Sequence, residues 1–319
     1  MVKQKRKVVL ITGCSSGIGL SLAVMLAKDE RKRYRVIATM RDLQRKDKLL
    51  EAAGDAYGKT LSLAVLDVCS DESVKQCISG IKDRHVDILI NNAGIGIVGP
   101  VESITLEEMK TVFETNVFGV IRMIKEVMPD MKQRRAGHII VISSVLGVQS
   151  TAARLHVIKH FFAIEGFCES LAVQLKMFNI KLVLSLIEPG PVRTDFELKM
   201  IQEVKERECP GADAETVYYF KELYLPSAIN IFPAVGQTPE EISRVSSHIQ
   251  YQCHNPFRNL TNSLYAPIVA LKYADETGGL SVNFFYHMLF NLGPVLHYTV
   301  TAMKFLSFGF LKSGTVSPH

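Results

Sequence analysis

The chain has 319 residues, of which 47% are apolar and 22% are charged, and its formal net charge is +5. These values exclude a disordered protein and fit one large α/β domain with an appendage better than two equal domains. The basic start over residues 3–7 precedes no apolar run of signal-peptide length, so we expect no secretory signal. The positive charge suits an anionic membrane face, whereas no interleaving of basic and aromatic residues indicates nucleic acid.

Six cysteines show no CxxC pair and no histidine at zinc spacing. We therefore expect reduced thiols in the cytoplasm, with no disulfide framework and no metal. The six are Cys14, Cys69, Cys77, Cys168, Cys209 and Cys253.

The first predicted elements are a strand over Val8–Ile11 and a helix from about Gly17 to Lys28, joined by a glycine-containing turn. A continuous apolar run is typical of a strand that is buried on both faces. The helix directs unpaired N–H groups and its dipole at the turn, which favours a phosphate there. We therefore predict the pyrophosphate site of a dinucleotide, with a glycine turn that binds nothing as the alternative. The predicted contacts are Gly13, Ser15, Ser16, Gly17, Ile18 and Gly19.

A second strand is predicted over Tyr34–Met40, and the residues at its end bear on the choice of nicotinamide cofactor. An arginine there pairs with the 2′-phosphate of NADP, whereas a carboxylate binds the ribose hydroxyls of NAD. Arg41 therefore predicts NADP (NADPH), with Ser16 as a second phosphate contact. Asp42 stands beside it, so NAD and a solvated loop arginine remain the alternatives.

Two further strands are predicted over Leu61–Leu66 and Val86–Ile90, and polar residues follow both. Asp67 is placed to accept a hydrogen bond from the adenine amino group, and two successive asparagines can satisfy ribose and strand backbone. A plain Asx turn is the alternative for the asparagines. The predicted contacts at these strand ends are Asp67, Val68, Asn92, Ala93 and Gly94.

A helix over Leu106–Arg122 carries Asn116, whose amide must find partners in apolar surroundings. A fifth strand over His138–Ile142 is followed by Ser144. Because strands and helices alternate along the chain, we predict an α/β fold with a Rossmann-type, doubly wound, mainly parallel sheet and helices on both faces.

The glycine pattern of the first turn, the Asn91–Gly94 tetrad, Asn116 and Ser144 together resemble the short-chain dehydrogenase/reductases, over about residues 7–200. Segments such as Glu188–Val192 resemble the branch that holds retinol and 17β-hydroxysteroid dehydrogenases. The resemblance implies hydride transfer between a nicotinamide and a carbinol carbon. Ser144 would be the catalytic serine that holds the substrate oxygen, and Asn116 would hold a water of the proton path.

The same resemblance calls for a tyrosine that exchanges the proton and, four residues later, a lysine that lowers the pKa of the phenol. Counting back from the matching segment Phe162–Gly166 places Val157 at the tyrosine position and Phe161 at the lysine position. Neither side chain can transfer a proton. The departure is confined to one block, 150–161, which is typical of an alternative exon or an error in the coding sequence.

Two histidines in this block, His156 and His160, lie four residues apart on the predicted helix, with Lys159 near both. Imidazole has a pKa suited to proton transfer. His156, however, is one residue from the tyrosine position, a rotation of about 100° around the helix. We therefore favour a surface or interface pair over a substitute for the tyrosine.

A rigid turn follows a sixth strand, and the resemblance implies that this loop covers the nicotinamide through Pro189, Gly190, Val192 and Thr194. The region from Phe196 to Pro233 is predicted to form two helices separated by Cys209–Gly211. They belong to a substrate lid at about 196–235 on a domain of residues 1–280. Four side chains of this region suit an apolar ligand or, equally, an ordinary helix core: Met200, Val217, Tyr218 and Phe220.

Residues 281–319 form an apolar C-terminal extension that polar residues and Gly293-Pro294 interrupt, so it falls short of a membrane span. We favour an interfacial segment flanked by Lys304 and Lys312, at the cytoplasmic side of a membrane. A helix packed on the domain or on a second subunit, in a cytoplasmic protein, is the alternative.

By resemblance, the expected activity is NADP(H)-dependent interconversion of all-trans-retinol and all-trans-retinal. A 17β-hydroxysteroid dehydrogenase is the nearest alternative, and a catalytically silent nucleotide-binding protein is the other. The expected partners are a small apolar substrate, retinoid or steroid, and a second copy of the chain. Members of the family commonly dimerise through the helices around Asn116 and Phe162.

Overall fold

The computed structural model describes residues 6–148, 155–177, 181–226, 229, 236–249 and 256–287, with the backbone alone at 155–159, 181–182, 249 and 285. The predicted block 150–161 therefore lies partly outside the described residues, and the side chains of His156, Val157 and Lys159 lie outside them too.

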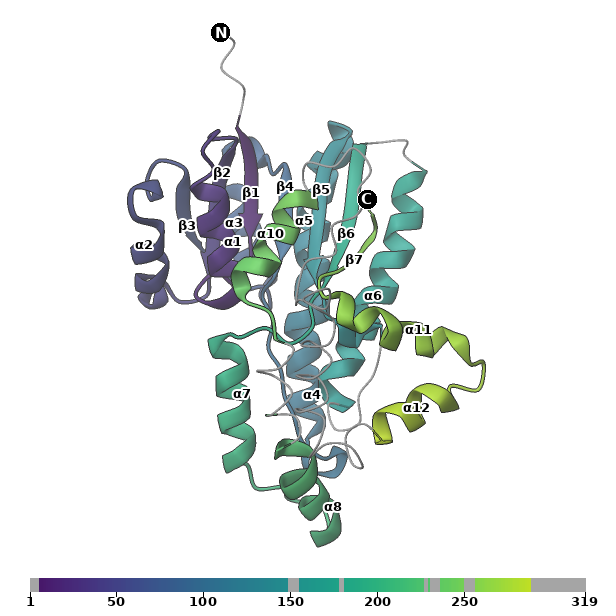
Figure 1. Ribbon diagram of the computed structural model, residues 1–319. Coiled ribbons are helices and arrows are strands. Elements are labelled where there is room, and N and C mark those ends of the chain that lie inside the picture. The colour runs from purple at the N-terminus through teal and green to yellow at the C-terminus, as the bar shows by residue number, and fades with distance from the viewer. Residues whose placement is uncertain are drawn as a thin grey trace, which may run out of the picture.

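Seven strands form one parallel sheet in the order β3-β2-β1-β4-β5-β6-β7 (Figure 1). The six predicted strands are confirmed, and a short seventh strand joins them at one edge. Because the strand order reverses between β1 and β4, a crevice opens at the carboxyl ends of these strands. The strands are β1 (Lys7–Ile11), β2 (Tyr34–Met40), β3 (Leu61–Val65), β4 (Ile88–Asn91), β5 (Ala136–Ile142), β6 (Lys181–Glu188) and β7 (Arg258–Leu260).

Helices cover both faces of the sheet, so the predicted doubly wound α/β fold is confirmed (Figure 1). In β1, Leu10 belongs to one core and Val9 and Ile11 belong to the other, and all three are fully buried. Burial of each such side chain contributes about 2 kcal/mol. The first core is covered by α3 (Asp71–Ser79), α5 (Gly119–Gln133) and α6 (Leu155–Lys176), and the second by α1 (Gly17–Ala27), α2 (Asp47–Ala53) and α10 (Pro239–Ile249).

The helix predicted over Leu106–Arg122 is divided by a π-helical turn. A capping box between Thr105 and Glu108 starts α4 (Leu106–Phe113), and the π-helical turn η5 (Glu114–Phe118) leads into α5. Asn116 lies in this turn. Single π-helical turns inside helices are frequent at functional sites.

Two predicted helices after β6 project beyond the carboxyl edge of the sheet (Figure 1). They are α7 (Asp195–Glu206) and α8 (Ala214–Tyr218), which continues as a π-helical turn, η7 (Tyr219–Tyr224). Met200 and Phe220 are buried in a third apolar cluster, whereas Tyr218 is exposed. These helices therefore enclose a small core of their own.

The described chain ends with η8 (Ser263–Tyr265), α11 (Ala266–Ala274) and α12 (Gly279–Tyr286). No described helix is long and apolar enough to cross a bilayer, and residues 288–319, with most of the predicted interfacial segment, lie outside the described part. The five described cysteines are free thiols, and Cys253 lies outside. Other short turns are η1 (Leu43–Arg45), η2 (Gly54–Ala56), η3 (Lys82–Arg84), η4 (Val101–Ser103) and η6 (Val145–Gly147).

Candidate active site

A cleft of about 750 Å³ lies at the carboxyl edge of the sheet and collects residues that follow six of the strands. Most of the predicted contacts line it. They are Gly13, Ser15, Ser16, Gly17, Ile18, Arg41, Asp67, Val68, Asn92, Ala93, Gly94, Asn116, Ser144, Phe161, Pro189, Gly190, Val192 and Thr194. Gly19 does not line the cleft, and the side chain of Val157 lies outside the described residues.

The glycine turn after β1 depends on two positions where no side chain fits. Gly13 has a φ of +72°, and a Cβ there would lie 2.8 Å from the Cα of Ala93. A Cβ on Gly19 would lie 2.3 Å from the carbonyl oxygen of Gly13 and 2.4 Å from Nδ2 of Asn92. Asn92 Nδ2 in turn donates to the Gly13 carbonyl at 3.0 Å. Because Gly19 has no side chain, α1 can approach the turn closely.

The polar groups around this turn fit a dinucleotide. Ser16 is the N-cap of α1 but makes no capping hydrogen bond with its side chain, so the first N–H groups of the helix are left for a ligand. Asn91 is 2% exposed and lines the cleft, yet neither its Oδ1 nor its Nδ2 has a partner among the described residues. Because a buried amide without partners is unfavourable, this side chain indicates a polar ligand in the cleft.

The end of β2 brings two arginines to the rim of the cleft. Arg41 is exposed there, and Asp42 uses its Oδ1 to accept from the N–H of Gln44 at 2.8 Å, which caps η1. Arg45, which was not among the predicted contacts, also lines the cleft. Its position only four residues after Arg41 could have indicated in the sequence that it lies near the same site. The Asp42 carboxylate is therefore partly engaged by its own turn, whereas two guanidinium groups border the site.

Asn116 holds the loop after β4 against α6. Its Oδ1 accepts from the N–H of Ile95 at 2.9 Å, its Nδ2 donates to the Ile95 carbonyl at 2.7 Å, and the same Nδ2 lies 2.8 Å from Nε2 of His160. Asn116 is 8% exposed and His160 is fully buried. The surface or interface position that we favoured for His160 is therefore wrong, since its imidazole is fully buried and lies within hydrogen-bond distance of the Asn116 amide.

Phe161 occupies part of the wall where the family resemblance calls for a lysine. The ring lines the cleft and packs against the apolar cluster of α7 and η7. Phe196 of α7 lines the same wall, and a Cβ on Gly96 would lie 3.0 Å from its ring. Apolar surface therefore extends from the sheet edge to the predicted lid.

Ser144 is half-buried beside the loop that follows β6. Its Oγ accepts from the N–H of Leu146 at 3.2 Å and lies 3.4 Å from the carbonyl oxygen of Pro189, a long contact for a hydroxyl donor. Its hydroxyl proton can consequently turn to a ligand oxygen. The neighbouring Ser143 also lines the cleft and donates to Glu165, a contact that sequence spacing does not reveal.

Comparison with known proteins places this site in a family. The sequence profile described as short chain dehydrogenase matches residues 7–205. The chain is 51% identical to retinol dehydrogenase 8 from Bos taurus over 291 residues, which cover 91% of this chain and 93% of that protein. It is 37% identical to 17-beta-hydroxysteroid dehydrogenase type 1 from Homo sapiens over 294 residues, covering 91% and 88%.

A solved structure has a similar fold. The crystal structure of a variant of actinorhodin polyketide ketoreductase with NADPH superposes with a TM-score of 0.64 at 25% identity, covering 78% of this chain and 91% of that one. The chain therefore belongs to the short chain dehydrogenase family of oxidoreductases.

Proposed function

We propose that this protein is an NADP(H)-dependent oxidoreductase for all-trans-retinol and all-trans-retinal, with turnover reduced by its residues at positions 157 and 161. The observation that carries the proposal is one cleft that joins the glycine turn, Ser144 and the apolar rings of Phe161 and Phe196. A retinoid is favoured over a steroid because identity is 51% to a retinol dehydrogenase and 37% to a steroid dehydrogenase.

NADP is proposed over NAD on the charges at the end of β2. The guanidinium groups of Arg41 and Arg45 border the cleft, where they would pair with a 2′-phosphate. Asp42, the residue that would favour NAD, accepts from the Gln44 N–H instead. When bound, the nicotinamide supplies or accepts the hydride.

The chain's own residues would bind and orient the substrate. Ser144 would donate a hydrogen bond from its hydroxyl group to the substrate oxygen, in place of its long contact with the Pro189 carbonyl. Asn116 would act as a positioning residue, since its amide already bonds Ile95 and His160. The loop with Val192 and Thr194 would cover the nicotinamide, and residues 196–235 would form the lid.

A catalytically silent nucleotide-binding protein is the second candidate, and the residue at the lysine position favours it. Phe161 presents a ring to the cleft and no charge that could lower the pKa of a proton donor. General acid–base catalysis contributes about 10²–10⁴-fold to rate. Loss of both members of the pair would leave binding intact while removing most of the turnover.

The deciding experiment compares the chain with Val157→Tyr/Phe161→Lys. Binding is followed by NADPH fluorescence, and turnover by NADPH consumption with all-trans-retinal or estrone. We expect tight NADPH binding by both proteins and about 10²-fold or more faster retinal reduction by the double variant. The matched control, Val157→Phe/Phe161→Lys, has a ring of similar size but no phenol and should stay slow.

Each outcome selects one candidate. NADPH binding by the unsubstituted chain with no reduction of retinal or estrone above the rate without protein selects the silent protein, and faster reduction of estrone than of retinal by the double variant selects the steroid enzyme. Failure to bind either NADPH or NADH would contradict all three candidates.

We also propose that two copies of the chain associate through α4 and α5. Leu106 of α4 is 71% exposed, and Phe118 of η5, which joins α4 to α5, is 49% exposed. Both side chains line the same surface depression, so they form one exposed apolar patch that a second copy could cover. Sedimentation velocity should show a dimer, and Leu106→Glu/Phe118→Glu should give a monomer. A monomer at all concentrations of the unsubstituted chain would contradict this proposal.

The extension 281–319 is proposed to contact the cytoplasmic face of a membrane. In α12, Leu280, Val282 and Tyr286 are 46%, 68% and 53% exposed, and the helix leads into this segment. Co-sedimentation with phosphatidylserine vesicles should capture the full chain and release a chain that ends at residue 278. Equal capture of both would contradict it.

A further inference from the structure

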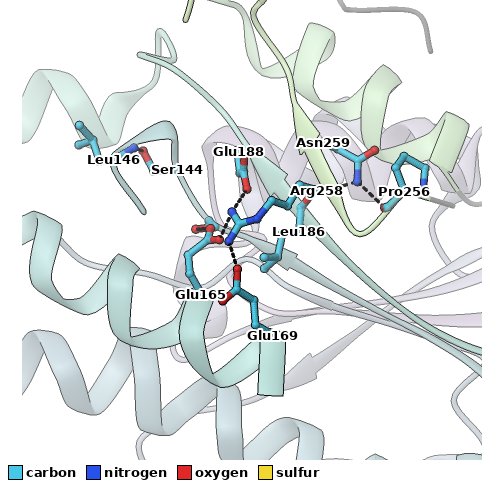
Figure 2. A network of polar contacts seen from close by, with 10 residues as sticks. Ser144, Leu146, Glu165, Glu169, Leu186, Glu188, Pro256, Arg258 and Asn259 are labelled. Atoms are coloured by element: carbon cyan, nitrogen blue, oxygen red, sulfur yellow. Dashed lines mark hydrogen bonds and ion pairs between the residues drawn. The ribbon is translucent and has the colours of Figure 1, made fainter. Parts of the chain in front are cut away.

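One arginine, Arg258, forms hydrogen bonds with three carboxylates next to the segments that line the candidate active site (Figure 2). Arg258 of β7 donates from Nη1 to Oε2 of Glu165 at 2.5 Å and from Nη2 to Oε1 of Glu169 at 2.6 Å. Its Nη1 also donates to Oε1 of Glu188, the last residue of β6. Residues of β6, α6 and β7 thus meet on a single guanidinium group.

The cluster is buried at Glu165 and Glu188 and reaches the surface at Glu169, and it carries more negative than positive charge. The side chains of Glu165 and Glu188 are each 4% exposed. Burial raises the pKa of Glu188 to about 7, with the Glu165 charge adding to the effect and Arg258 opposing it. Burial also raises the pKa of Glu165, against the hydrogen bond from Ser143 and the Arg258 charge. Lys272 of α11 is near Glu165 and Glu169: burial lowers its pKa, and the charges of these two carboxylates oppose that effect.

Glu165 connects this cluster with the segment that carries Ser144. The hydroxyl group of Ser143 donates a hydrogen bond to Oε1 of Glu165. The turn η6 lies on the same carboxylate, since a Cβ on Gly147 would lie 2.8 Å from Cγ of Glu165 and 2.9 Å from Oε1. Ser144 is therefore flanked on both sides in the chain by residues that touch Glu165.

Glu188 connects the cluster with the loop that is predicted to cover the nicotinamide. Pro189 follows directly, and its carbonyl accepts from the N–H of Val145 at 2.8 Å. The segment after β7 supports the same loop, because Thr261 N donates to the Glu188 carbonyl at 3.2 Å. The ring of Tyr265 packs so closely that a Cβ on Gly190 would lie 2.6 Å from it.

We propose that Arg258 is a positioning residue that fixes the segment 143–147 and the loop 188–190 relative to each other. It would thereby set the spacing between Ser144 and the nicotinamide-covering loop. The inference rests on the proposed function, because it concerns how that site is held. Small displacements of groups that contact a ligand change binding and rate strongly, so a residue that holds both segments in place affects the site.

The test compares Arg258→Met with Arg134→Met. Both variants keep an apolar stem and remove a guanidinium, but Arg134 bonds Asp130 and Asp87 at the amino end of the sheet, away from the cleft. Hydrogen exchange is measured on the ligand-free chains, and NADPH affinity by fluorescence. Arg258→Lys, which keeps the charge but not the two-armed geometry, is the third variant.

We expect Arg258→Met to accelerate exchange over residues 143–148 and 186–190 and to weaken NADPH binding about tenfold. Arg258→Lys should fall between this variant and the unsubstituted chain, and Arg134→Met should leave both readouts of the cleft unchanged. Uniformly faster exchange over the whole sheet, or equal effects of Arg258→Met and Arg134→Met on the cleft, would overturn the proposal.

If Arg258→Met fails to fold, the comparison of Arg258→Lys with Arg134→Lys decides by the same criterion. If the unsubstituted chain binds no NADPH, the proposed function fails. The exchange of residues 143–148 and 186–190 in the ligand-free chain still tests the role of Arg258.

Discussion

The two halves of the cleft differ in what their residues can do. At the ends of β1 and β4, Thr12 Oγ1 accepts from the N–H groups of Asn92 and Ala93 at 2.9 Å each, and this joins the strands beneath the glycine turn. At the end of β5, Ser144 shares the cleft with Phe161, a ring where the family pattern has a charge. The residues proposed to hold the nucleotide are therefore separate from those proposed for proton transfer, so one set can persist when the other is replaced.

The largest effect is expected from a substitution in the proposed nucleotide-binding half of the cleft, at Gly19. In Gly19→Ala, the methyl group would lie 2.3 Å from the Gly13 carbonyl oxygen, which is backbone and cannot move aside without shifting the turn. We expect a loss of about 3 kcal/mol or more in the free energy of unfolding and loss of NADPH binding. Urea unfolding followed by circular dichroism measures the first, because the chain has no tryptophan.

Gly166→Ala is the matched control in the other half. Gly166 lies in α6 and a Cβ there meets nothing within 4 Å. The substitution should stabilise the protein by about 0.5–1 kcal/mol, since glycine is unfavourable inside a helix. Equal effects of the two substitutions would show that the close approach at Gly19 is not what shapes the turn.

The next largest effect is a pH dependence that belongs to the second half. Glu188 has its pKa raised from 4.5 to about 7 in the folded chain. A group with a raised folded pKa contributes stability that is complete below the unfolded pKa and is lost as pH rises through the folded one. Relative to Glu188→Gln, the unsubstituted chain should therefore lose on the order of 2 kcal/mol between pH 4.5 and pH 7.

Urea unfolding at pH 4.5, 5.5, 6.5 and 7.5 checks this slope. Glu51→Gln, which removes one negative charge from an exposed position of α2, controls for the change in net charge. Parallel stability curves for Glu188→Gln and the unsubstituted chain would contradict the prediction.

The sequence alone predicted the elements whose patterns are local. An apolar run followed by glycines was enough for β1 and α1, and β2 was predicted with the bounds that the structure has, Tyr34–Met40. The need of Asn116 for partners also followed from an amide in an apolar helix. Its actual partners, Ile95 and His160, lie 21 and 44 residues away, so spacing could not name them.

Contacts between distant segments account for what was missed. The strand β7 has three residues, too few for a periodic pattern, and Arg258 by itself is no different from a loop arginine. Its carboxylate partners Glu165 and Glu188 stand 93 and 70 residues before it. Likewise, Asp42 blurred the choice of cofactor in sequence because its hydrogen bond to the Gln44 N–H is a property of the folded turn.

The smallest expected effect concerns the choice between NADP and NAD. Arg41→Ala should weaken NADPH binding about tenfold and leave NADH binding unchanged, because only NADPH carries the 2′-phosphate. Asp42→Ala is the matched control. Its Oδ1 accepts from Gln44, so its loss should change the preference for NADPH over NADH by less than about threefold.

Fluorescence titrations with both nucleotides distinguish the two roles open to Arg41. Equal weakening of NADPH and NADH in Arg41→Ala would mean that Arg41 supports the turn and does not read the phosphate. In that case Arg45, the other guanidinium at the rim, would be the group to substitute next. Because neither residue belongs to the β5–α6 half, the preference should be the same in the chain with Val157→Tyr/Phe161→Lys. A preference that changed in that variant would show that the two halves of the cleft are coupled after all.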